Sequence, residues 1–152
     1  LAGYAAQLGS DCAFFVHDVP MFATGRGDVL QPIELNLAGY ELLVVKPPFG
    51  VSTAEAYAGV RPQAPRQALR EAIAQGVEAW RDVLHNDFEP SVFAQHPQLA
   101  EAKQRMYELG ATYAAMSGSG SAVYGLFEQL PRGVAQCFAG WATFCQPFAN
   151  TI

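Results

Sequence analysis

Residues 111–127 read ATYAAMSGSGSAVYGLF, and this stretch decides the fold class of the chain. Apolar runs at Thr112–Met116 and Ala122–Phe127 flank the small residues Ser117–Ser121, a pattern that predicts two strands joined by a turn. The turn has two interpretations. Its glycines and serines are typical of a plain hairpin, but they can also let backbone N–H groups converge on an anion such as a phosphate.

Strands and helices alternate around this pair. Tyr40–Lys46 predicts a buried strand, which Pro47 ends because proline donates no hydrogen bond to a ladder. Further elements are expected as helices at Gln67–Leu84, Pro97–Leu109 and Pro131–Phe138 and as a last strand at Trp141–Phe148. This order predicts an α+β fold built as a two-layer sandwich.

The N-terminal part has its own pattern. Leu1–Leu8 predicts a helix, Asp11–His17 a short helix or buried turn, and Met21–Ile33 a hairpin or bulged strand around two glycines. The chain opens with Leu inside its first expected helix, so we expect a further region upstream.

Composition narrows the function classes. The 152 residues are 51% hydrophobic and 15% charged, with a net charge of −5. A charged fraction below the usual value of about 25% predicts a surface that meets another surface. No basic cluster predicts nucleic-acid binding, and no apolar run is long enough for a membrane span. The three cysteines have no metal-binding spacing, so we expect them and both tryptophans in the core, in a reducing cytoplasm.

Three further stretches could carry chemistry. Asp11 follows an expected helix and precedes an aromatic run, which suits either a proton acceptor or a helix cap. The second stretch is Gly50–Tyr57, in which Ser52 or Thr53 is expected to cap a short helix that runs through Tyr57. Tyr57 could stack on a base and Thr53 could donate a hydrogen bond, or the stretch is only a capped helix with a core aromatic. The carboxylates of Asn86–Pro90 could hold Mg²⁺ or could close one helix and start the next.

The order of these motifs resembles a known family. Gly9–Asp11, Ala23–Asp28, Gly50–Tyr57, Asn86–Glu89 and Met116–Gly120 run in the series found in the C-terminal half of the 4-diphosphocytidyl-2-C-methylerythritol kinases, within the GHMP kinase superfamily. The similarity spans about Leu8–Glu128. Two departures, at Ala13 and at Ser121-Ala122, affect neither Asp11 nor the glycines.

The resemblance implies phosphoryl transfer from ATP to a hydroxyl of the cytidine-bearing substrate. It assigns Asp11 as the catalytic aspartate, Thr53 and Tyr57 to the cytidine, and Ser117, Gly118, Ser119 and Gly120 to the nucleotide phosphates. It gives Asn86 and Asp87 no catalytic role.

The resemblance also implies a ferredoxin-like C-terminal domain at residues 37–152, preceded at residues 1–36 by a remnant of an N-terminal kinase domain. The cationic groups and the long ATP loop of such kinases, with most of the Mg²⁺ site, would belong to the absent half, so these residues alone are expected to be inactive. The face left bare could form a homo-oligomer. Two alternatives stay open: a fragment of another GHMP small-molecule kinase, and a non-catalytic α+β module that binds a ligand or a partner.

Overall fold

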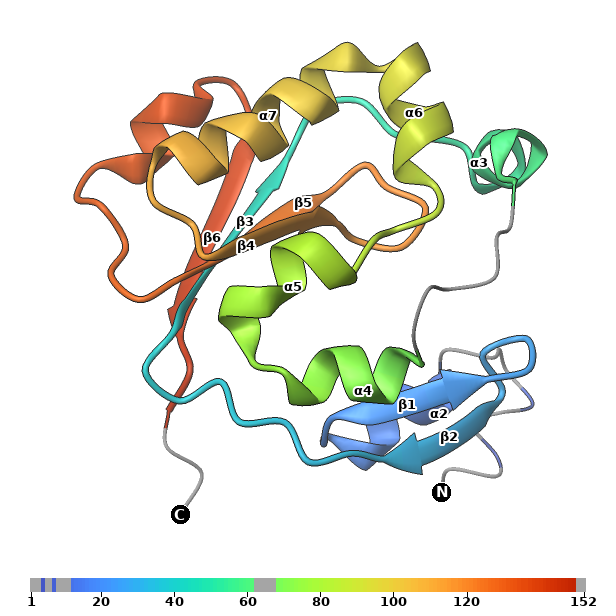
Figure 1. Cartoon of the computed structure of the whole chain (residues 1–152). Helices are drawn as coiled ribbons and strands as arrows, with labels where there is room; N and C mark the ends of the chain where they lie inside the picture. Colours follow the sequence, from blue (N-terminus) through green and yellow to red (C-terminus); the bar gives the residue numbers. More distant parts are fainter. Residues whose placement is uncertain (1–3, 5–6, 8–11, 62–67, 150–152) are drawn as a thin grey trace. The chain divides into compact units, whose positions relative to one another are not determined.

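The structure is a computed structural model that describes residues 4, 7, 12–61 and 68–149. The chain divides into two compact units, residues 1–36 and 37–152 (Figure 1). Of the helix expected at Leu1–Leu8, only Tyr4 and Gln7 are described, and both are helical. Asp11, the expected catalytic aspartate, lies outside the described residues.

The first unit holds a short helix and a hairpin. Helix α2 spans Cys12–His17, and strands β1 (Met21–Thr24) and β2 (Val29–Pro32) pair antiparallel with Thr24 opposite Val29. The Gly27 N–H donates to the Thr24 carbonyl at 3.1 Å, and Gly27 has a φ of 88°, a conformation that only glycine adopts without strain. The hairpin expected at Met21–Ile33 is therefore confirmed.

The second unit is built on a four-stranded sheet. Its strands are β3 (Glu41–Lys46), β4 (Tyr113–Met116), β5 (Val123–Phe127) and β6 (Ala142–Pro147). Their spatial order is β4-β5-β3-β6, and every neighbouring pair is antiparallel. Numbered within this unit, the order is 2-3-1-4, which is the ferredoxin-like arrangement. The α+β, ferredoxin-like expectation is confirmed.

Helices connect the first two strands of this sheet. In chain order they are α3 (Thr53–Gly59), α4 (Leu69–Ala74), α5 (Val77–Val83), α6 (Glu89–Gln95) and α7 (Pro97–Glu108). A short 3-10 helix, η1 (Val134–Phe138), connects β5 to β6 in place of the longer helix expected from Pro131. Figure 1 shows α7 lying along one face of the sheet.

The core lies between α7 and that face. Leu43 and Val45 alternate along β3 with no exposed surface, and Leu99 and Met106 of α7 are equally buried. Burying one such side chain contributes about 1.5–3 kcal/mol. On the other face of the sheet, the Trp80 ring of α5 packs edge-on against Tyr113 of β4, with centroids 5.5 Å apart.

One expected helix is two helices. The pattern over Gln67–Leu84 predicts a continuous helix, but α4 ends at Ala74 and α5 begins at Val77. Gly76 separates them with a φ of 89°, which a continuing helix cannot contain. The break lets the Trp80 indole N–H donate to the Ile73 carbonyl at 3.2 Å, so the buried Trp80 ring satisfies its only polar group.

The prediction that the cysteines lie in the core is wrong. Cys137 and Cys145 are exposed and Cys12 is half-buried. Cys145 belongs to β6, an edge strand whose six residues are all exposed. Trp80 is buried as expected, whereas Trp141 is only half-buried at the margin of the core.

Candidate functional site

Three segments that are far apart in the sequence come together at the loop between β4 and β5. These segments are Phe49–Tyr57, Asn86–Glu89 and Ser117–Ser121. The Ser121 hydroxyl donates to the Phe49 carbonyl at 2.9 Å, and Asn86 reaches the same loop from the segment that precedes α6. The motifs singled out in the second unit therefore lie around one place in the fold.

The loop is a turn with free backbone donors. The Ser117 N–H donates to the Ala122 carbonyl at 2.8 Å, and the Gly120 N–H donates to the Ser117 carbonyl at 3.0 Å. Within the described part of the chain, the N–H groups of Gly118 and Ser119 have no acceptor. Uncommitted N–H groups in a turn with left-handed residues suit an anion, so this loop fits a phosphate group.

The two glycines of the loop differ in their surroundings. Gly118 has a φ of 55°, and a Cβ built there meets nothing within 4 Å. Gly120 has a φ of 97°, and a Cβ there would lie 2.9 Å from the Met116 sulfur and 3.6 Å from Val51. Gly118 is thus open to solvent or a ligand, whereas Gly120 is packed against the protein.

The Asn86 side chain holds the loop through hydrogen bonds to two backbone carbonyl groups. Its amide nitrogen donates to the carbonyls of Met116 and Gly118, both at 2.8 Å, and its Oδ1 accepts the Phe88 N–H at 2.9 Å. Three of the four hydrogen bonds available to this side chain are made. The sequence pattern identified the Asn86 motif but not this role.

Glu89 anchors the same segment. Its carboxylate is buried, accepts the Met116 N–H at 2.8 Å and pairs with the Lys103 ammonium group at 2.6 Å. Both oxygens are therefore engaged by protein groups, which does not fit the magnesium interpretation of this motif. Lys103 is half-buried, and its ammonium group neutralises the buried Glu89 carboxylate.

Thr53 and Tyr57 lie one turn apart on α3, so both side chains share a helix face. Both are exposed, and 63% of Tyr57 is accessible. The Tyr57 ring rests edge-on against Phe88, with centroids 4.9 Å apart and planes at 74°. The interpretation of Tyr57 as a core aromatic is wrong, and so is the expected side-chain cap, because Ser52 precedes α3 without a capping hydrogen bond.

Helix α3 packs closely on α6. A Cβ at Gly59 would lie 2.7 Å from that of Ser91, so only glycine allows this approach. The Oε1 atom of Glu55 lies 3.8 Å from Nε2 of His96, the residue that follows α6. These contacts hold α3, which carries Tyr57, against α6.

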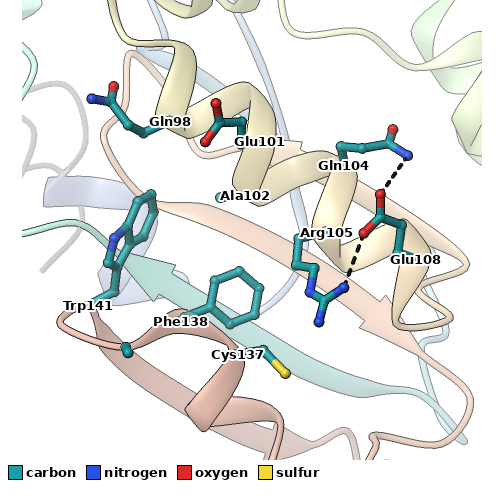
Figure 2. Close-up of a pocket in the computed structure, with 10 residues that line it drawn as sticks. Gln98, Glu101, Ala102, Gln104, Arg105, Glu108, Cys137, Phe138 and Trp141 are labelled. Carbon is teal, nitrogen blue, oxygen red and sulfur yellow. Dashed lines mark hydrogen bonds and ion pairs between the residues drawn. The ribbon is translucent and has the colours of Figure 1, made fainter.

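A separate surface cavity lies between α7 and the η1 segment. Its volume is about 490 Å³, and its lining comes from α7, η1 and Trp141 (Figure 2). Its cation, Arg105, is paired with Glu108 at 3.2 Å, and Glu108 also accepts from Gln104 at 3.4 Å. Thr53, Tyr57 and Ser117–Gly120, the expected site residues that the structure describes, do not line this cavity.

Comparison with known proteins identifies the family. Residues 66–139 match the model described as GHMP kinases C terminal. The chain is 54% identical over 130 residues to the 4-diphosphocytidyl-2-C-methyl-D-erythritol kinase of Bacteroides thetaiotaomicron, an alignment of 86% of this chain and 47% of that protein. The chain belongs to the GHMP kinases. The corresponding kinase of Bacteroides fragilis is 50% identical over 95% of this GHMP kinase chain and 52% of its own length.

Solved structures agree with the fold of this GHMP kinase chain. A crystal structure of 4-(cytidine 5'-diphospho)-2C-methyl-D-erythritol kinase aligns with a TM-score of 0.71 and 30% identity, over 95% of this chain and 55% of that one. Homoserine kinase from Cytophaga hutchinsonii aligns at 0.53 with 18% identity, which supports the fold alone. The chain spans about half the length of the curated relatives it matches.

Among the described residues, no group of three or more His, Cys, Asp or Glu side chains is placed to hold a metal ion. None of the helices in the described ranges is both long enough and apolar enough to cross a bilayer.

Proposed function

We propose that this chain is the C-terminal part of an ATP-dependent kinase that phosphorylates a hydroxyl of 4-diphosphocytidyl-2-C-methyl-D-erythritol, a step of non-mevalonate isoprenoid biosynthesis. The relatives that are 54% and 50% identical carry this kinase name. The observation that carries the proposal is the convergence of an exposed aromatic, Tyr57, and a loop with free N–H groups, Ser117–Gly120, around one segment of the fold.

Each predicted residue has a role in this proposal. The Ser117–Gly120 loop contacts the phosphates of ATP through the free N–H groups of Gly118 and Ser119, and Thr53 and Tyr57 bind the cytidine. Asp11 accepts or orients the proton of the attacking hydroxyl. Mg²⁺ is held mainly by the part of the longer relatives that this chain does not span.

The cellular setting is proposed as well. We place the enzyme in the bacterial cytoplasm, since the relatives are bacterial kinases of small molecules. Residues 1–36 are proposed as part of an N-terminal kinase domain and residues 37–152 as the C-terminal domain. We propose no nucleic-acid or membrane partner, and association of this chain with itself through an apolar face.

Substrate choice tests the proposal directly. The full-length protein is incubated with ATP and Mg²⁺ and with either 4-diphosphocytidyl-2-C-methyl-D-erythritol or homoserine, and ADP release and product mass are followed. We expect phosphorylation of the cytidine compound only. Phosphorylation of homoserine alone would assign the chain to another GHMP kinase, and binding without turnover of either compound would favour a non-catalytic module.

Tyr57→Ala in the full-length protein should weaken the cytidine substrate by about 1–3 kcal/mol, the usual contribution of one stacked base. The KM for ATP should change little, because Tyr57 is proposed to contact only the base. Isothermal titration with each ligand measures both affinities. Equal weakening of the two ligands would mean that the substitution disturbs the fold, and stacking would be rejected.

The two loop glycines should respond differently to valine. Gly118→Val places a side chain in open space where the phosphate is proposed, so it should raise the KM for ATP or lower kcat. Its φ of 55° strains a valine, which costs some stability without a steric clash. Gly120→Val should lower the melting temperature more, since its side chain meets the Met116 sulfur. Steady-state kinetics and thermal melts of both variants separate the effects. Normal kinetics for Gly118→Val would show that the loop is only a hairpin.

A further inference from the structure

Asn86 determines where one free donor of the glycine loop, the Ser119 N–H, points. The carbonyl and N–H of a trans peptide unit point in opposite directions. Because the Gly118 carbonyl accepts from the Asn86 amide at 2.8 Å, the Ser119 N–H in the same peptide unit is directed away from Asn86. The Met116 carbonyl also accepts from Asn86, and the Ser117 N–H of that unit donates to Ala122 on the other side. One side chain thus orients two alternate peptide units of the strand end and loop, 116–117 and 118–119.

Phe88 makes the second contact of this segment. Its N–H donates to Asn86 Oδ1, which closes a turn, and its ring makes a T-shaped contact with the exposed Tyr57 ring. Tyr57 has most of its surface free, so the contact with Phe88 restricts the angle at which its face is presented.

Glu89 makes the segment rigid. It is buried, it accepts the Met116 N–H at 2.8 Å, and Lys103 of α7 neutralises it at 2.6 Å. Asn86 and Phe88 therefore belong to one short segment that Glu89 holds against β4 and α7. The hydrogen bond between the Phe88 N–H and Asn86 Oδ1 closes the segment internally.

We propose that Asn86 and Phe88 are positioning residues, and that their segment sets the place of the phosphate-binding loop relative to the Tyr57 ring. The inference rests on the proposed function, which gives the loop to ATP and Tyr57 to the cytidine of the acceptor. Those two groups belong to the two different substrates of one reaction. The segment therefore fixes the spacing between the donor phosphate and the base of the acceptor, and neither of its two residues needs to touch a reacting atom.

Two substitutions separate the two contacts in the full-length protein. Asn86→Asp keeps an oxygen for the Phe88 N–H but loses both amide donors, so the turn stays and the loop is released. We expect the KM for ATP to rise or kcat to fall by about 10-fold, which is the effect of losing one to two hydrogen bonds. The KM for the cytidine-bearing substrate should change by less than about 2-fold. Phe88→Ala should do the reverse, raising the cytidine KM by about 5-fold through loss of the ring contact while the ATP KM stays constant.

Matched variants and a second readout complete the test. Phe88→Tyr keeps the ring and should restore the cytidine KM, and Asp87→Asn changes the exposed residue between the two and should leave both constants unchanged. Amide NMR spectra of wild-type protein and Asn86→Asp should differ at Gly118 and Ser119, and the hydrogen-bonded Ser117 and Gly120 amides should exchange faster in the variant. Thermal melts confirm that each variant is folded.

The outcomes are distinguishable. If wild-type protein phosphorylates the cytidine substrate but both variants change both KM values equally, or neither value, the positioning claim is overturned while the proposed function stands. If wild-type protein shows no turnover, the proposed function fails. The NMR comparison then decides the claim by itself, and unchanged Gly118 and Ser119 amides in Asn86→Asp would overturn it.

Discussion

Asp11→Asn in the full-length protein should lower kcat by at least about 10²-fold, with little change in ATP binding, because a general base typically contributes about 10²–10⁴-fold. The amide is nearly the same size as the carboxylate and still forms hydrogen bonds, but it cannot accept the proton of the attacking hydroxyl. Steady-state kinetics with both substrates and a direct ATP titration measure the two quantities.

Asp18→Asn is the matched control for this substitution. Asp18 lies in the same unit, is exposed and has a φ of 50°, a conformation that Asn tolerates as well as Asp. It removes the same charge without touching the proposed chemistry, so kcat should be unchanged. A near-normal kcat for Asp11→Asn would return Asp11 to the role of a helix cap.

The 152 residues by themselves should show no detectable phosphorylation of 4-diphosphocytidyl-2-C-methyl-D-erythritol. Phosphoryl transfer depends on positioning and on cations around the phosphates. The chain has two lysines. Lys103 is committed to Glu89, and Lys46 at the end of β3 donates to the Pro47 carbonyl at 3.4 Å. Product formation followed by mass spectrometry over hours, beside the full-length protein at equal concentration, measures the difference.

Folding of the short chain must be verified in the same preparation. A cooperative thermal melt shows that inactivity does not come from an unfolded sample. Turnover by the folded 152 residues would mean that the site for ATP is complete within this chain and that the proposed division of roles is wrong.

Local sequence patterns predicted much of the fold. The strands expected at Tyr40–Lys46, Thr112–Met116 and Ala122–Phe127 and the helix at Pro97–Leu109 agree with the structure to within one residue at each end. Each carries its signal in adjacent residues: a continuous apolar run, a regular apolar spacing, or a proline or glycine at its boundary. The break at Gly76 was not predicted, since the apolar spacing continues through it and glycine is also tolerated inside helices.

The candidate site divides in the same way. Glycines and serines at 117–121, an aromatic at Tyr57 and the polar Asn86 motif are visible in the sequence as residue types suited to phosphate, base and hydrogen bonding. Their arrangement depends on contacts between residues distant in the chain: Asn86 with Gly118, Glu89 with Met116 and Ser121 with Phe49.

The sequence by itself thus determined the elements, the fold class and the residue types of the site. Only the tertiary structure decided that Tyr57 is exposed, that Lys103 neutralises a buried carboxylate and that Asn86 orients the loop. The physical reason is that local structure follows from backbone preferences of neighbouring residues, whereas every residue carries a carbonyl that Asn86 could bind. Which carbonyl it binds is settled when α6, β4 and α7 pack together and bury Glu89 between them.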